Sequence, residues 1–132
     1  MPKLVTIRIP TRDGINTLTG TVHLMPLVEG GTPVRFVVEQ REDGSIGNLT
    51  HYASGWQFYP RLEDLRVIHR LDHGTYAPRM TVREAVRAAV DRIVAANGLD
   101  VVKKRLAAAP VLNPEPRRQR RGRGLLDAPS YD

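Results

Sequence analysis

The chain has 132 residues and a formal net charge of +6, from 20 Lys and Arg against 14 Asp and Glu. This length suits a single domain, which can bury roughly two-thirds of the surface of its unfolded chain. Cys is absent, which excludes disulfides, thiolate nucleophiles and Cys-based zinc sites. The sequence shows neither the apolar segment of a signal peptide nor a membrane span, so we expect a cytoplasmic protein with no membrane partner.

The first half of the chain has the pattern of β-strands joined by tight turns. Apolar and polar residues alternate with a period of two, most clearly over residues 33–40. The pairs Asp13-Gly14 and Asp43-Gly44 are typical of hairpin turns, whereas Gly20 and Pro26 indicate a bulge or an edge position. The predicted strands cover about residues 5–9, 15–27, 33–40 and 46–58, and they favour an antiparallel meander.

Residues 61–80 fit two structures. The apolar residues at 62, 65, 68 and 71 have the spacing of a helix, whereas Val67, His69 and Leu71 also alternate as a strand would. We favour a short fifth strand around Arg66–Arg70, followed by a loop.

The second half of the chain predicts two helices. Thr81 and Glu84 form a capping-box pattern at the start of an apolar stripe that repeats at i, i+3, i+4 and i+7. Asn97-Gly98 marks the end of this helix, and a second helix ends before Pro110. These patterns together predict an α+β fold, in which an antiparallel β-meander of four to five strands is followed by two helices packed on one face.

A cluster of arginines distinguishes the end of the chain. We expect residues 1–110 to form the single domain and residues 111–132 to form a flexible, Pro/Arg-rich basic tail. Such a segment repels itself and contacts polyanions, so we predict that it binds DNA or RNA. Arg121-Gly122-Arg123 resembles the Arg-Gly-Arg core of AT-hook arms, and this three-residue resemblance implies contact with a DNA minor groove. The tail residues predicted to bind nucleic acid are Arg117, Arg118, Arg120, Arg121 and Arg123.

Lys103, Lys104 and Arg105 extend this basic surface onto the second helix. Positive charge near the C-terminus of a helix also suits the helix dipole. Only about a dozen residues separate Arg105 from Arg117, so the helix and the tail can form one basic strip. We therefore predict a non-catalytic accessory or regulatory protein that binds nucleic acid with low sequence specificity.

Other residues favour an alternative function, protein interaction. Leu125, Leu126 and Tyr131 have no predicted core to join and can dock on a partner as a short motif. Tyr52 and Trp56 lie on one face of the predicted fourth strand, where they either belong to the core, stack on bases or anchor a partner. The alternative is an interaction module, either an assembly component or an inhibitor of a larger machine.

Three histidines suggest a third, remote alternative. His51, His69 and His73 come close together if the fourth and fifth strands pair, and a histidine pair can carry out acid–base catalysis on RNA. The protein would then be a small ribonuclease. No third metal ligand accompanies His69 and His73, and no glycine-rich phosphate motif is present. We therefore predict no catalytic residue, no metal and no cofactor.

Overall fold

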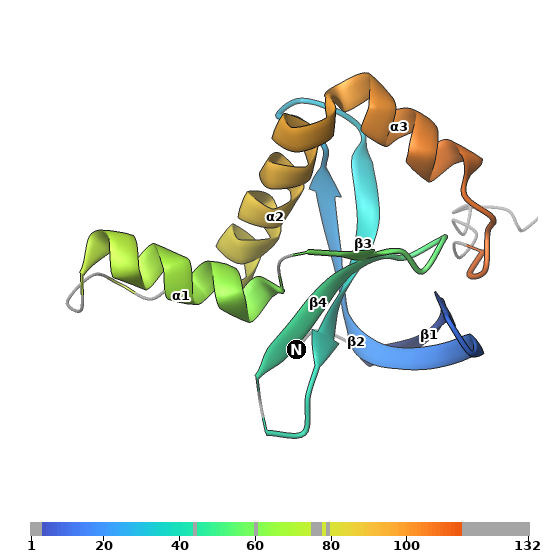
Figure 1. Cartoon of the computed structure of the whole chain (residues 1–132), viewed down its shortest axis with the longest axis horizontal. Helices are drawn as coiled ribbons and strands as arrows, with labels where there is room; N and C mark the ends of the chain where they lie inside the picture. Colours follow the sequence, from blue (N-terminus) through green and yellow to red (C-terminus); the bar gives the residue numbers. More distant parts are fainter. Residues whose placement is uncertain (1–3, 44, 60, 75–77, 79, 115–132) are drawn as a thin grey trace, which may run out of the picture.

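In the described part of the chain, five strands come first and three helices follow them (Figure 1). The computed structural model describes residues 4–43, 45–59, 61–74, 78 and 80–114. Neighbouring strands pair antiparallel in chain order, which confirms the α+β class and the predicted meander. The described elements are β1 (Leu4–Thr11), β2 (Gly14–Pro26), β3 (Pro33–Gln40), β4 (Ile46–His51), β5 (Gln57–Phe58), α1 (Leu62–His73), α2 (Val82–Asn97) and α3 (Leu99–Ala108).

The long strand β2 belongs to both halves of a curled sheet. Residues 14–21 of β2 pair with β1, and residues 20–26 pair with β3. The two ladders overlap at Gly20 and Thr21, and a Cβ atom on Gly20 would collide with the backbone carbonyl of Val38. Glycine therefore permits the close approach at which β2 bends, and Figure 1 shows this curvature. The prediction of a bulge or an edge position at Gly20 is wrong, because β2 pairs on both sides and the irregular register lies between Val38 and Gln40.

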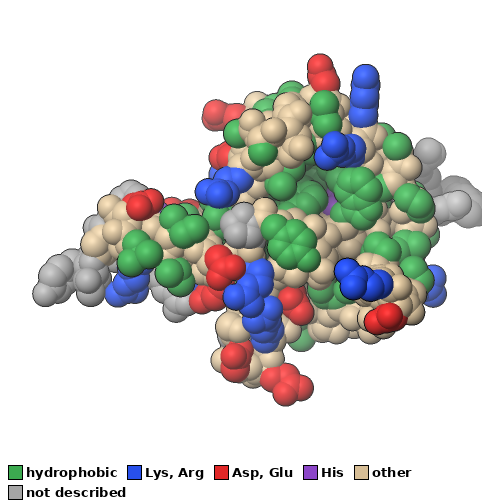
Figure 2. Space-filling model, viewed as in Figure 1, with side chains coloured by type: hydrophobic (Ala, Val, Ile, Leu, Met, Phe, Trp, Pro, Cys, Tyr) green, Lys and Arg blue, Asp and Glu red, His purple; other side chains and the backbone are tan. Residues whose placement is uncertain are grey.

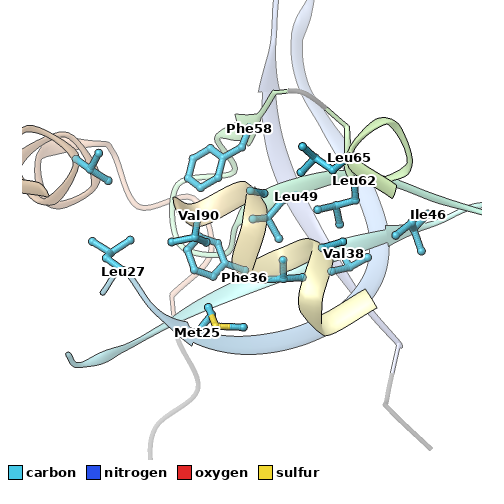
Figure 3. Packing of buried hydrophobic residues seen from close by; sticks show 14 residues of the cluster. Met25, Leu27, Phe36, Val38, Ile46, Leu49, Phe58, Leu62, Leu65 and Val90 are labelled. Atoms are coloured by element: carbon cyan, nitrogen blue, oxygen red, sulfur yellow. The ribbon is translucent and has the colours of Figure 1, made fainter. Parts of the chain in front are cut away.

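The main core lies between the sheet and the helices (Figure 3). Phe36 and Val38 of β3 are fully buried, and α2 covers them with the apolar stripe that the sequence predicts. The ring of Phe36 meets that of Phe58 edge-on, with 5.7 Å between the centroids. Burying one such side chain contributes about 1.5–3 kcal/mol. The other buried members of this core are Met25, Leu27, Ile46, Leu49, Leu62, Leu65, Ala85, Val86, Ala89, Val90 and Val102.

The curl of the sheet encloses a second, smaller core. Ile7, Ile9, Leu18 and Val37 are buried together, and Tyr52 packs against them. Successive side chains of a strand point to opposite faces, so β3 contributes to the main core with one face and to this cluster with the other. The two cores therefore share β3, whose central residues are completely buried.

The helix α1 occupies the region where the sequence favours a fifth strand, and that prediction is wrong. Leu62 and Leu65 both bury their side chains in the main core. A strand would place residues three apart on opposite faces, whereas a helix places them on the same face. Arg66 pairs with Glu63 at 3.0 Å along the helix, and Gly74, with a φ of 88°, ends it. The described residues therefore form three helices where the sequence predicts two.

A tight turn interrupts the predicted fourth strand. β4 ends before residues 52–54, which form the turn, and β5 pairs back against β4. Gly55 adopts a φ of 73°, and a Cβ atom there would lie only 2.6 Å from the carbonyl oxygen of Arg8. The segment predicted as one strand is therefore a hairpin, which separates Tyr52 from Trp56.

The last described residues pack against the same turn. Leu112 and Asn113 both donate their backbone N–H groups to the carbonyl oxygen of Ala53, at 2.8 and 3.0 Å. The Asn113 side chain accepts a hydrogen bond from the backbone N–H of Arg8 at 2.7 Å, and it donates to the carbonyl oxygen of Arg8 at 2.8 Å and to that of Tyr52 at 2.9 Å. Asn113 thus acts as a clamp on β1, the edge strand. The packed part of the chain extends past the point where the sequence predicts the tail to begin.

The helix α2 begins and ends where the sequence predicts. Thr81 Oγ1 accepts a hydrogen bond from the backbone N–H of Glu84 at 3.1 Å, and the Glu84 carboxylate accepts one from the backbone N–H of Thr81 at 2.8 Å. These bonds hold the pKa of Glu84 below its usual value. Gly98, with a φ of 89°, ends α2 and leads directly into α3. Among the described residues, no helix is long and apolar enough to cross a membrane.

Candidate nucleic-acid interface

The helix α3 carries three adjacent exposed cations, Lys103, Lys104 and Arg105. Within the described part of the chain, none of the three forms an ion pair or a side-chain hydrogen bond. Arg87 on the neighbouring helix α2 differs, since its guanidinium pairs with Asp91 at 2.8 Å. The α3 cations therefore remain available for an external anion.

A small apolar pocket opens beside these cations. Its volume is about 130 Å³. Figure 2 shows hydrophobic side chains gathered below α3, with Lys and Arg side chains around them. The pocket brings together Trp56, predicted to dock a partner, and Arg105, predicted to bind nucleic acid. Its other walls include Phe58, Asn97, Val102 and Leu106.

A chain of hydrogen bonds in the β4–β5 turn holds Trp56. The backbone N–H of His51 donates to the carbonyl oxygen of Trp56 at 2.7 Å, and the backbone N–H of Trp56 donates to Ser54 Oγ at 3.2 Å. Ser54 Oγ also lies 2.7 Å from His51 Nδ1, and both of these residues are buried. The turn therefore fixes the backbone of Trp56, while 37% of the residue stays exposed.

The last described residues are anchored to the turn that precedes Trp56. Asn113 is bonded to the carbonyl oxygen of Tyr52, so the end of the packed chain is anchored to the turn that carries Trp56. The predicted tail residues lie outside the described part of the chain: Arg117, Arg118, Arg120, Arg121, Arg123, Leu125, Leu126 and Tyr131.

Tyr52 does not join Trp56 in this pocket. Its side chain is half-buried against the second core, and the Arg35 guanidinium lies 5.5 Å from the centre of its ring. An uninterrupted strand would present Tyr52 and Trp56 on one face. Because of the turn at residues 52–54, the two side chains do not share a strand face. The structure therefore packs Tyr52 against the second core, whereas Trp56 lines the pocket next to α3.

The three histidines considered for catalysis do not meet across a pair of strands. His51 is buried, with its ring centroid 6.2 Å from that of Phe36. His69 and His73 belong to α1, so the strand pairing predicted to bring all three together is wrong. The described residues contain no group of three or more His, Cys, Asp or Glu side chains that could hold a metal ion.

A larger, open hollow lies between the β2–β3 turn and α2. Arg87 lines it, but its guanidinium donates to the carbonyl oxygens of Pro26 and Leu27, at 2.7 and 2.9 Å, as well as to Asp91. These bonds attach the turn to the helix. We therefore assign Arg87 a structural role, not a role in anion binding.

One exposed apolar surface is absent from the sequence predictions. The exposed fractions of Val67, Ile68 and Leu71 on α1 are 55%, 42% and 78%, and Figure 2 shows hydrophobic side chains along this helix. The helical spacing was the only sequence pattern that could have indicated this face.

The sequence singles out both Trp56 and Arg105 but assigns them to different surfaces. Their proximity depends on the β4–β5 hairpin and on the packing of α3 over it, which no local pattern specifies. Comparison with protein-family models, curated proteins and solved structures finds no match.

Proposed function

We propose that this protein binds nucleic acid with low sequence specificity, as an accessory or regulatory protein and not as an enzyme. The contacts come from Lys103, Lys104 and Arg105 of α3 and from the arginines of residues 117–123. The observation that carries the proposal is the absence of any anionic partner for the α3 cations among the described residues. Lys and Arg gain free energy at phosphates because condensed counterions are released. The proposal places the protein in the cytoplasm, where reducing conditions suit a chain without Cys.

Low specificity follows from the kind of contact that these residues make. Lys and Arg side chains on phosphates fix the position of a protein on nucleic acid but carry no sequence information. Arginine also binds phosphate through two parallel hydrogen bonds, which strengthens the contact without selecting a base. We therefore expect similar affinities for unrelated sequences of equal length.

A charge-matched pair of variants tests this proposal. Lys103→Ala with Lys104→Ala removes two cations from α3, whereas Arg12→Ala with Arg92→Ala removes two exposed cations that also form no ion pair within the described part of the chain. The α3 variant should lower the magnitude of the slope of log affinity against log salt by about 1.4 to 1.8, at 0.7 to 0.9 per phosphate contact. The control should leave the slope unchanged. Equal effects of the two variants would contradict the proposed interface.

The apolar face of α1 favours a second candidate function, protein interaction within a larger assembly. Contiguous apolar side chains at a surface often mark a protein interface. Val67→Ser with Leu71→Ser should release a protein partner that survives nuclease treatment, while Leu24→Ser, at another exposed apolar position, should retain it. A partner held equally by both variants would remove this candidate.

A further inference from the structure

The pocket beside α3 has room for one flat ring. Its volume of about 130 Å³ is close to the roughly 150 Å³ at which an apolar cavity accepts a benzene molecule. Trp56 supplies an aromatic wall, and Phe58, Val102 and Leu106 supply apolar ones. Such a lining favours an aromatic or aliphatic group over a charged one, since a buried charge needs a partner.

The rim of the pocket adds polar and cationic groups to this apolar interior. Arg105 is the cation that lines the pocket, whereas the exposed side chains of Lys103 and Lys104 leave α3 in other directions. Asn97 also lines it, and its Nδ2 donates to the carbonyl oxygen of Ile93 at 3.0 Å, which leaves its side-chain oxygen as an acceptor. A ligand that suits the whole site joins a flat ring with hydrogen-bonding edges to an anionic chain.

Hydrogen bonds fix the backbone of Trp56 before any ligand binds. The bonds from His51 and to Ser54 fix the backbone on both sides of the turn. Gly55 brings the same turn within contact distance of β1, and Asn113 clamps β1 to it. A ring presented on a rigid turn loses little conformational entropy on binding, which favours stacking.

We propose that this pocket binds one unpaired nucleobase of a single-stranded nucleic acid, which stacks on Trp56 while Arg105 contacts an adjacent phosphate. This inference rests on the proposed function and adds the class of nucleic acid. A base within a duplex has both of its faces covered by its neighbours, so it cannot enter a pocket of this size. Base–aromatic stacking is tolerant of sequence, because every base has a π-face. The site therefore predicts preference for single strands without preference among bases.

The fluorescence of Trp56 tests the proposal in the unmodified full chain, because Trp56 is its only tryptophan. A short thymidine or uridine single strand should quench the emission of Trp56 on binding. A hairpin duplex of the same length should bind through phosphates and leave the emission unchanged. Fluorescence anisotropy of labelled strands measures total binding in the same solutions, independently of Trp56.

A matched pair of aromatic substitutions provides a second readout. Trp56→Ala should weaken binding of the single strand by about five- to 150-fold, the range of one stacked base, while duplex affinity stays unchanged. Trp56→Phe keeps a ring on the turn and should retain most of the affinity if the domain is intact. Tyr59→Ala is the control, since Tyr59 is 70% exposed and does not line the pocket.

The outcomes separate this inference from the proposed function. Unchanged Trp56 emission at saturation, with binding still detected by anisotropy, would overturn the base pocket and leave nucleic-acid binding intact. Equal quenching by the duplex would overturn the preference for unpaired bases. No anisotropy change with any strand at roughly 50 mM salt, where phosphate contacts are strong, would overturn both.

Discussion

The clamp formed by Asn113 provides the most quantitative prediction from this fold. Asn113→Ala removes the side-chain hydrogen bonds to the N–H and the carbonyl oxygen of Arg8 and to the carbonyl oxygen of Tyr52. Each of these hydrogen bonds contributes about 1 kcal/mol net to the free energy of unfolding. The expected total is about 2–3 kcal/mol, because water can replace part of the lost bonding at the exposed edge of β1. The free energy of unfolding should fall by that amount.

Urea denaturation followed by circular dichroism measures this change. With a slope of about 2 kcal/mol/M, the midpoint should fall by about 1 to 1.5 M at an unchanged slope. The control is Val111→Ala, whose side chain is 64% exposed and which should stay within about 0.5 kcal/mol of the wild type. Truncation after Pro114 should likewise preserve stability, while truncation after Leu112 should reproduce the loss. An Asn113→Ala protein as stable as the Val111→Ala control would refute the clamp.

Three further predictions concern other parts of the fold. Gly55→Ala should destabilise the domain by about 1–3 kcal/mol, because a residue with a side chain is strained at a φ of 73° and its Cβ would press on the backbone of Arg8. Thr81→Ala removes the side-chain cap of α2 and should lower the free energy of unfolding by about 1 kcal/mol, as measured in urea. Burial, aided by the charge of Arg83, lowers the pKa of His23 below 6.5, so the unfolded chain takes up this proton first as the pH falls. The resulting contribution to stability is present above pH 6.5 and is lost as the pH falls through the folded-state pKa. His23→Gln should therefore lose less free energy of unfolding than the wild type on acidification. Equal losses in the two proteins would contradict the lowered pKa of His23.

The predictions that succeed are those in which local chemistry decides the structure. The capping box of Thr81 and Glu84 and the glycine after Asn97 fix both ends of α2 without help from the rest of the chain. The Asp-Gly and Gly-Gly turns likewise fix the order of the strands, since short turns can join only antiparallel neighbours.

The predictions that fail depend on burial, which a local pattern does not reveal. Residues 62–71 carry both a helical and a strand-like spacing, and the helix forms because it buries Leu62 and Leu65 together in the main core. The break after β4 depends on Gly55, whose close approach to Arg8 involves a part of the chain distant in sequence. Neither contact can be read from the residues nearby.

In the candidate site too, the individual residues could be predicted from the sequence, but their arrangement could not. Lys103, Lys104 and Arg105 could be identified from charge alone, and Trp56 from the scarcity of aromatic residues. The meeting of Trp56 and Arg105 in one pocket requires the hairpin and the packing of α3, so it appears only in the folded chain.

The salt dependence of nucleic-acid binding tests the central claim most directly. If three α3 cations and five tail arginines all contact single-strand phosphates, eight contacts at about 0.7 each give a slope of log affinity against log salt of about −5.6. A chain truncated after Pro114 keeps the Asn113 clamp and the α3 cations and should show a slope of about −2. Equal slopes for the two chains, or a slope near zero for the full chain, would contradict a function built on these cations.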